Sequence, residues 1–390
     1  MASEFAEEAV RTVPSAANRI PLAEPDLRGR EAEYLGRCVA DNWVSSAGPF
    51  VEQFERGIAK VAGCAHGVAT VNGTAALHLA LVAAGVAPGD AVIVPDYTFA
   101  ATANSVIHAG AVPYFVDVTQ ESWSLDPDLV AKALADAKPR VVAVVAVHTL
   151  GQPADIDALK AVCERAGAIL IEDAAGAIGA SYKGRPAGSL ADAAIFSFNG
   201  NKTVTAGGGG MIVTNRADWA QRAKRQSQQA RVGARYRYDA AGYNFRLTNV
   251  NAAIGMAQLE RLPEMLEAKR KIANRYDAAL VGRNDLRPMP RAPWADSACW
   301  LYSVLCGTRA SADELVQSLN ARGIEARHFW ESLSPQSPYR SFPSLLSGVS
   351  EHLTGRVVSL PCSTHLTADQ QDRVCAALTE WRGEGIEKAA

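Results

Sequence analysis

The chain has 390 residues, of which 48% are hydrophobic and 21% charged, and its formal net charge is −2. This length accommodates one large and one smaller domain, each with its own core. The nearly balanced charge creates no overall field that would attract nucleic acid or an anionic membrane. We therefore expect a globular protein whose partners are neither nucleic acid nor lipid.

The cysteines and the amino terminus indicate where the protein works. Seven cysteines, an odd number without a C-x-x-C pair, are typical of a reduced protein. The first 13 residues are acidic and rich in alanine, without the apolar segment of a signal peptide, and no apolar run has membrane-spanning length. The seven histidines lack metal-ligand spacing. We expect a cytoplasmic protein without a metal site.

The first 260 residues predict a layered α/β domain. Residues 1–20 carry few core-forming side chains and are expected to form a loose arm, and two helices follow around a polar loop at 43–49. Strands rich in Val, Ile and Ala then alternate with helices, which implies a mainly parallel sheet covered on both faces. The predicted helices are 28–42, 50–62, 74–84, 100–109, 128–137 and 156–166, and the predicted strands are 68–71, 91–94, 112–116, 141–147, 168–171, 193–198 and 211–214.

The rest of the chain predicts a smaller α+β domain. A long helix, interrupted near Pro263, spans 259–280 and connects the two parts. The boundaries predicted are thus an arm at 1–20, a large domain at 21–260 and a small domain at 261–390. Within the small domain we expect strands at 301–305 and 357–360 and helices at 312–321 and 368–381.

Polar residues follow three of the predicted strands, at the edge where parallel sheets bind ligands. Asn72–Ala76 opens a helix with a glycine turn and free N–H groups, which suits an anion. Glu172 and Asp173 leave a buried strand, and one of these carboxylates should enter a crevice. Ser197 offers a hydroxyl for the same anion, in addition to that of Thr74 at the helix start, and Lys202 lies in the turn after Ser197.

Lys202 suggests a common function for the helix start at Asn72–Ala76 and the acidic pair Glu172 and Asp173. No acidic residue lies between Asp192 and Asp218, and four glycines follow Lys202, so the lysine lacks a local ion-pair partner and a ligand could approach the backbone. A free lysine, with a pKa of about 10.4, is almost fully protonated at neutral pH, and it reacts with an aldehyde by forming a Schiff base. Taken singly, these features equally fit a solvated lysine, an ordinary helix start and a helix cap.

Together, an anion cradle, a carboxylate and an amine are what pyridoxal 5′-phosphate (PLP) requires. They would hold its phosphate, pair with its ring nitrogen and bind its aldehyde. Their occurrence at three strand ends in this order favours a cofactor site over chance.

With these residues placed, the chain resembles the DegT/DnrJ/EryC1/StrS family of sugar aminotransferases, PLP enzymes of fold type I, the aspartate aminotransferase fold. The resemblance covers residues 21–381, and it is carried by WVSSAGPFVEQFE, VNGTAALHLAL, VPDYTFAATANSVIHAGAVPYFVDV, HTLGQPADID, IEDAAGAIGA, FSFNGNKTVTAGGGGMIVTN, GYNFRLTNVNAAIGMAQLERL and VVSLPCS.

The resemblance implies roles for individual residues. Lys202 would form the internal Schiff base, Asp173 would pair the pyridine nitrogen, and these two would be the catalytic residues. Phe99 would lie in the loop that stacks on the ring, and Asn244 would reach the phosphate of a neighbouring subunit, which makes a homodimer with shared active sites. The cofactor-binding set would be Gly73, Thr74, Ala75, Phe99, Asp173, Ser197, Asn199, Lys202 and Asn244.

The chain departs from the family pattern at two places. Gly176 stands where Gln, His or Glu is more common, which leaves either a space or an unmade contact beside the cofactor. Thr149 and Leu150 stand where an aliphatic and an aromatic residue are more usual and could reshape the cavity wall. Neither departure touches Lys202, whose presence argues against the related dehydratases that carry histidine there.

The resemblance implies amino transfer, with L-glutamate as donor, to a keto sugar. The segments WVSS, FNGNK and GYNFRL favour a nucleotide-linked 4-keto-6-deoxyhexose, and His328 and Trp330 are expected to face this substrate. A keto-cyclitol, a free keto sugar acid and a non-catalytic PLP-binding regulator stay open as alternatives, whereas a dehydrogenase is disfavoured because G-x-G-x-x-G is missing. A basic run, with Arg222 and Arg237 at its ends, is either a solvated helix face or a nucleotide diphosphate site.

Overall fold

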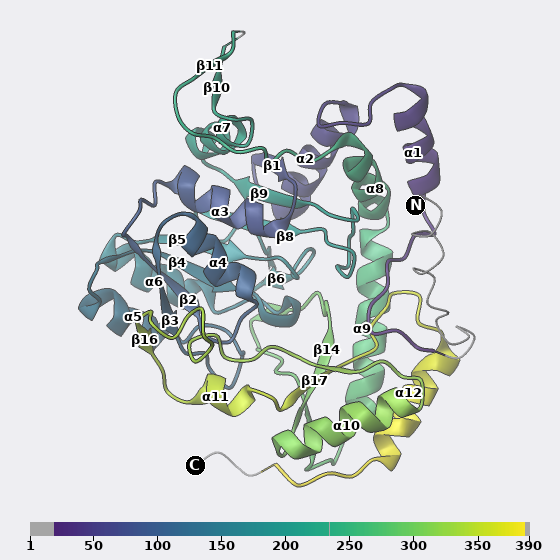
Figure 1. The fold of residues 1–390 in the computed structure, drawn as a ribbon. Coiled ribbons are helices and arrows are strands. Elements are labelled where there is room, and N and C mark those ends of the chain that lie inside the picture. Colours follow the sequence, from purple (N-terminus) through teal and green to yellow (C-terminus); the bar gives the residue numbers. More distant parts are fainter. Residues whose placement is uncertain (1–18, 234, 387–390) are drawn as a thin grey trace, which may run out of the picture.

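The computed structural model describes residues 19–233 and 235–386, so most of the predicted arm, residues 1–18, lies outside the described residues. An eight-stranded sheet dominates the larger part of the molecule (Figure 1). Every strand except β9 runs in the same direction. In spatial order the strands are β1 (His66–Thr70), β9 (Gly210–Thr214), β8 (Ala193–Ser197), β5 (Ile169–Asp173), β4 (Val141–Val147), β2 (Ala91–Pro95), β3 (Val112–Val116) and β16 (Ser344–Leu345).

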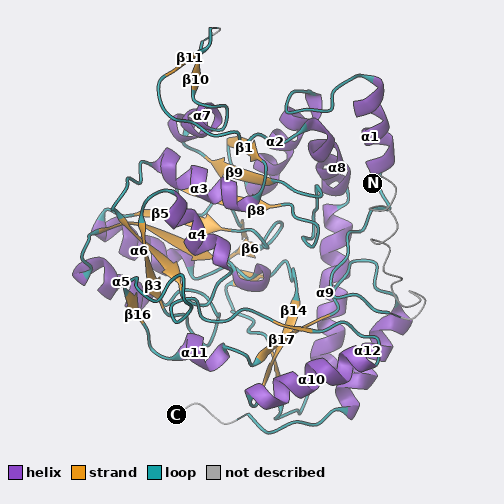
Figure 2. Ribbon diagram, viewed as in Figure 1, coloured by secondary structure: helices purple, strands orange, loops and turns teal. Residues whose placement is uncertain are grey.

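Helices cover both faces of this sheet, because successive residues of each buried strand point to opposite sides. In β4, Ala143 and Val145 pack with α3, α4 and α7, while Val144 and Ala146 pack with α5 and α6. Figure 2 shows the resulting three layers. The predicted α/β class with a mainly parallel sheet is confirmed. The covering helices are α3 (Gly73–Ala84), α4 (Ala100–His108), α7 (Ala217–Gln226), α5 (Pro127–Asp136) and α6 (Ile156–Ala166).

The second part is built around a four-stranded sheet and the long helix α9 (Leu262–Ala279), which runs past it (Figure 1). This sheet has the order β12 (Leu286–Pro288), β14 (Tyr302–Cys306), β17 (Val357–Leu360) and β15 (Arg327–His328). Its helices are α10 (Arg309–Ala321), α11 (Val349–Leu353) and α12 (Ala368–Glu380).

Smaller elements complete the architecture. The helices α1 (Glu31–Ala40), α2 (Pro49–Ala62) and α8 (Asn249–Glu260) pack together beside the large sheet. A three-stranded sheet consists of β13 (Ala295–Asp296), β6 (Ser181–Tyr182) and β7 (Arg185–Pro186), and a hairpin of β10 (Arg231–Val232) and β11 (Arg237–Tyr238) projects beyond α7 (Figure 1). None of the helices among the described residues is long and apolar enough to cross a membrane.

The structure differs from the sequence-based expectation at several element ends. The strand predicted at 168–171 continues through Asp173, because the backbone ladder to β4 and β8 persists while both carboxylates find hydrogen-bond donors. The helix predicted at 259–280 is two helices that meet at Arg261, and the first begins at Asn249, where the Thr248 side chain accepts from Asn251 N.

The domain boundary predicted near residue 260 falls beside this junction, but segments from each side of it also pair with the other part. In the small part, β16 pairs with β3 of the large sheet, and β13 pairs with β6. Ile20 and Leu22 bond to Gly323 and Cys362 of the small part, so the beginning of the described chain lies against it. The domain boundaries therefore stay a prediction.

Candidate active site

A cavity of about 530 Å³ lies at the carboxyl edge of the large sheet. Its floor comes from the residues that follow β1, β2, β4, β5 and β8, and the small part supplies the opposite wall through Trp300, Leu301 and the segment after β15. The predicted site residues that line this cavity are Gly73, Thr74, Phe99, Asp173, Ser197, Asn199, Lys202, His328 and Trp330.

Lys202 lies in the turn after β8, which its N–H closes by donating to Asn199 O at 3.0 Å. Its Nζ lies 3.4 Å from the centroid of the Trp300 ring. Among the described residues no carboxylate comes within ion-pair distance of this amine, and burial lowers its pKa to about 7 although Asp173 opposes the shift. A large fraction of the Lys202 amine is therefore unprotonated at neutral pH, the form that attacks an aldehyde.

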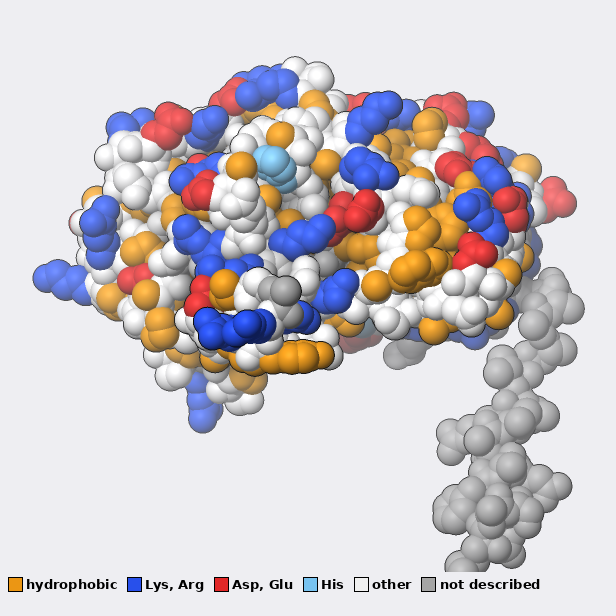
Figure 3. Space-filling model, turned by 90° about the horizontal axis from the view of Figure 1, so that it is seen from above, with side chains coloured by type: hydrophobic (Ala, Val, Ile, Leu, Met, Phe, Trp, Pro, Cys, Tyr) orange, Lys and Arg blue, Asp and Glu red, His pale blue; other side chains and the backbone are white. Residues whose placement is uncertain are grey.

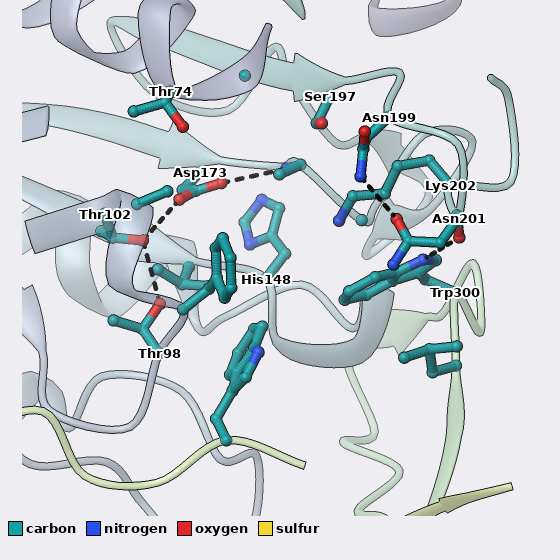
Figure 4. A pocket seen from close by; sticks show the side chains of 18 of the residues that line it. Thr74, Thr98, Thr102, His148, Asp173, Ser197, Asn199, Asn201, Lys202 and Trp300 are labelled. Atoms are coloured by element: carbon teal, nitrogen blue, oxygen red, sulfur yellow. Dashed lines mark hydrogen bonds between the residues drawn. The ribbon is translucent and has the colours of Figure 1, made fainter. Parts of the chain in front are cut away.

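Asp173 is the last residue of β5, and its buried carboxylate is held from two sides. Oδ2 accepts from the Thr102 hydroxyl at 2.9 Å and Oδ1 from Ala175 N at 3.2 Å (Figure 4). Because an ionised carboxylate only accepts, Thr98, 3.1 Å from Thr102, must donate to Thr102. Burial raises the pKa of Asp173, and the Thr102 hydrogen bond acts against it. A bound cation would remove this penalty on the charged form.

Glu172, the neighbouring acid, has a different set of partners. It accepts from Gly188 N, Leu190 N and Ala191 N, and it lies 2.9 Å from His148 Nε2. His148 Nδ1 accepts from Ala154 N at 3.2 Å, so Nε2 carries the proton donated to Glu172. His148 has no metal-ligand spacing in the sequence, but it follows β4 directly and lines the cavity, so the rule that ligands bind at the carboxyl ends of strands points to it.

The amino terminus of α3 forms the polar end of the cavity. Asn72 Oδ1 caps the helix by accepting from Ala75 N at 2.8 Å, whereas the N–H groups of Gly73 and Thr74 have no acceptor within the described chain. A Cβ on Gly73 would lie 2.9 Å from Ser197 Cβ, so only glycine keeps the space between helix and hydroxyl open. Two free N–H groups at a helix start beside a serine suit a phosphate. The Ala75 N–H is already used, and Ala75 does not line the cavity.

Two further residues of the predicted cofactor-binding set, Asn244 and Phe99, are exposed. Asn244 is exposed, forms an isolated bridge with Gln228 and lies outside the cavity of its own chain. Phe99, at the start of α4, lines the cavity but leaves 59% of its surface exposed.

The residues of the basic run do not form one helix face, and two of them form local ion pairs. Lys224 pairs with Glu55 at 2.9 Å and Arg225 with Asp239 at 2.6 Å. Arg231 and Arg237 lie on the projecting hairpin. Figure 3, which views the molecule from the side of α7 and this hairpin, shows Lys and Arg side chains interspersed with acidic ones.

The two departures from the family pattern meet at Trp300, a residue that the sequence analysis did not select. A Cβ on Gly176 would lie 2.9 Å from Trp300 Cε3, so the indole occupies the space beside Gly176. Leu150, within the short 3-10 helix Thr149–Gly151, has a φ of 58°, and its carbonyl accepts from Trp300 N at 3.0 Å. The space left by Gly176 is therefore filled from the small part.

Comparison with known proteins decides the family. The sequence profile described as the DegT/DnrJ/EryC1/StrS aminotransferase family matches residues 25–379. The chain belongs to this family. It is 40% identical over 366 residues to the GDP-perosamine synthase of Caulobacter vibrioides, covering 93% of this chain and 98% of that protein, and 36% identical over 366 residues to that of Vibrio cholerae, covering 93% and 99%.

Solved structures of relatives have the same fold. DesV of S. venezuelae superposes with a TM-score of 0.86 at 32% identity, covering 94% of this chain and 100% of that chain. DesI, determined in the presence of its TDP-sugar product, superposes with a TM-score of 0.85 at 33% identity, covering 93% and 92%. The protein is thus a PLP-dependent aminotransferase of fold type I, as predicted.

The residues present in the cavity fit this cofactor. Free N–H groups and Ser197 lie at one end, a buried carboxylate without an ion-pair partner lies on β5, and an amine without one lies in the turn after β8 (Figure 4). The described residues contain no cluster of His, Cys, Asp and Glu that could hold a metal ion.

Proposed function

We propose that this aminotransferase transfers an amino group from L-glutamate to a nucleotide-linked keto sugar, a 4-keto-6-deoxyhexose. The similarity over almost the whole length to GDP-perosamine synthases carries this proposal. The similarity to DesI, whose structure was determined with a TDP-sugar product, supports the sugar-nucleotide class independently. Arg327 and His328, both exposed at the cavity wall, add cationic and hydrogen-bonding groups suited to a diphosphate.

When bound, pyridoxal phosphate supplies an aldehyde that couples to amines and a ring that accepts electrons. In our proposal Lys202 binds it covalently, and its Nζ, once free, moves a proton to or from the substrate carbon. Asp173, oriented by Thr102, would hold a proton on the ring nitrogen, because a carboxylate favours the charged form of a neighbouring cation. Gly73, Thr74 and Ser197 would hold the phosphate, Phe99 would lie in the loop that stacks on the ring, and His328 and Trp330 would contact the sugar.

A screen of acceptors tests the proposed substrate. The cofactor is first converted to its amine form with glutamate, and nucleotide-linked keto sugars, a keto-cyclitol and a free keto sugar acid are then offered separately. The aminated product is detected by mass spectrometry. We expect it only with the nucleotide-linked 4-keto-6-deoxyhexoses, and we expect no product from the Lys202→Ala variant. Amination of the cyclitol or the free acid alone would contradict the substrate class. Failure of glutamate to yield 2-oxoglutarate would contradict the donor.

We also propose that the protein is a homodimer whose sites are shared. The support is that Asn244 is exposed outside its own cavity, while apolar residues of the same domain, Trp43, Val44 and Phe99, are 45%, 53% and 59% exposed. Lys202→Ala and Asn244→Ala are each expected to be inactive. Mixing them under exchange conditions should restore activity at about a quarter of the sites, since half of the dimers are hybrids with one intact site. No recovery on mixing, with hybrid dimers present, would contradict shared sites.

We place this activity in the cytoplasm. All seven cysteines are unpaired, as expected of a protein in a reducing compartment. Fractionation of cells that produce the protein should recover it with cytoplasmic enzymes, and recovery outside the cytoplasm would contradict this proposal.

A further inference from the structure

Gly176 and Trp300 form a complementary pair in the cavity wall. A Cβ on Gly176 would lie 2.9 Å from Trp300 Cε3 and 3.2 Å from Cδ2, distances at which the indole would have to move. Gly176 is not among the glycines with positive φ, so its backbone conformation is open to any residue. Glycine is therefore required at position 176 because the indole occupies the space that a side chain would need.

Trp300 is fixed by all three of its polar groups. Its N–H donates to Leu150 O at 3.0 Å, its carbonyl accepts from the buried Lys269 Nζ at 2.8 Å, and its indole Nε1 donates to Asn201 O at 2.8 Å. Only 7% of the residue is exposed. The three partners belong to three different segments, and together they hold both the backbone and the indole of Trp300.

The fixed indole lies against the reactive lysine. Lys202 Nζ is 3.4 Å from the ring centroid, and Asn201, bonded to the edge of the same indole, directly precedes Lys202 (Figure 4). In its protonated form the amine is attracted by the quadrupole of the indole ring, and this attraction is strongest where water is excluded. The Trp300 side chain, which belongs to the small part, thus contacts both the backbone of Asn201 and the amine of Lys202.

We propose that Trp300 is a positioning residue that places the amine of Lys202 in the cavity, and that Gly176 is required because its side chain would displace this indole. The inference rests on the proposed role of Lys202 and concerns the geometry of its amine, not the choice of sugar. Trp300 also makes the position of Lys202 depend on the small part, through Lys269 of α9.

Labelling of Lys202 in the cofactor-free protein tests the positioning role without any catalytic activity. The rate of reductive methylation at Lys202 is measured by peptide mass spectrometry across pH 6 to 10, together with thermal unfolding. Trp300→Leu should change the pH midpoint and the rate for Lys202 and slow covalent capture of PLP at least about tenfold, a mid-range coupling for residues in contact. Trp300→Phe, which keeps a ring face but loses the Asn201 hydrogen bond, should recover part of this loss.

Trp294→Leu is the matched control. Trp294 is partly buried and, like Trp300, donates its Nε1 to a carbonyl, Pro153 O at 3.1 Å, but it lies outside the cavity. It should lower stability without altering the labelling of Lys202. If Trp300→Leu behaves like this control, with lower stability and unchanged Lys202 labelling, Trp300 is a core residue only and the proposal is wrong.

A double-mutant cycle tests the role of Gly176. Gly176→Ala should slow capture of PLP about tenfold in the wild-type background and less than about twofold in Trp300→Leu, because the space is then free. Equal effects in both backgrounds would overturn the shared-volume argument. Normal capture at Lys202 in a protein that aminates no sugar would overturn the proposed function and leave this inference intact.

Discussion

The pKa of Lys202 leads to a prediction for the pH dependence of cofactor capture. Burial lowers this pKa from 10.5 to about 7, and the described residues supply no ion pair to restore it. At pH 7 about half of the amine is then unprotonated, against about one part in three thousand for an unperturbed lysine, so capture gains on the order of a thousandfold. The rate should rise with pH through 7 and become constant above about 8.

Stopped-flow absorbance of the cofactor-free protein mixed with PLP gives this rate, and labelling provides an internal reference. Lys183 is exposed, and its hydrogen bond to Asp157, at 2.8 Å, raises its pKa. In one experiment on amine methylation, Lys202 should show a midpoint near pH 7 while Lys183 shows none below pH 10. A Lys202 midpoint above pH 9 would refute the argument that burial activates this amine.

Further predictions follow from the same contacts. The cofactor-free protein should gain stability as the pH rises from 7 to 10.5, because Lys202 keeps its proton up to about pH 10.5 in the unfolded chain and only up to about pH 7 in the folded one. Lys202→Met should abolish this gain. If the stability of the wild type and of the variant changed with pH in parallel, this prediction would be wrong. Because burial raises the pKa of Asp173, the cofactor-free protein should lose stability as the pH rises above the unfolded value of 3.8; Asp173→Asn should remove this loss while lowering kcat, as thermal unfolding and kinetics would show. Thr102→Val should lower kcat by about ten- to a hundredfold, in line with about 1.5–3 kcal/mol for a hydrogen bond to a charged group, and an unchanged kcat would count against the orienting role. Gly73→Ala should weaken PLP binding, measured by titration, whereas Gly200→Ala, with nothing within 4 Å of its Cβ, should not.

The fold and the floor of the site could be predicted because both depend on local patterns. Near-continuous Val and Ala in strands such as β4 indicated a sheet buried on both faces, and parallel strands bring their carboxyl ends to one edge. That rule alone brings Ser197, Asp173 and Lys202 together, as the structure does.

The cavity wall could not be predicted in the same way, because it depends on contacts between distant segments. Trp300 follows no motif, and its indole reaches Lys202 only through the packing of α9 and the short helix at Leu150. The pairing of β16 with β3 likewise joins residues separated by more than two hundred positions. Gly176 departs from the family pattern, but the sequence does not show that the Trp300 indole fills the space beside it.

The lysine that binds the cofactor can be located by trapping it covalently. The protein is loaded with PLP, reduced with borohydride, digested and mapped by mass spectrometry, and the same sample is assayed for amino transfer before and after reduction. We predict one phosphopyridoxyl group per chain, on Lys202, with complete loss of activity on reduction. Attachment to another lysine, or activity that persists in Lys202→Ala, would contradict the account.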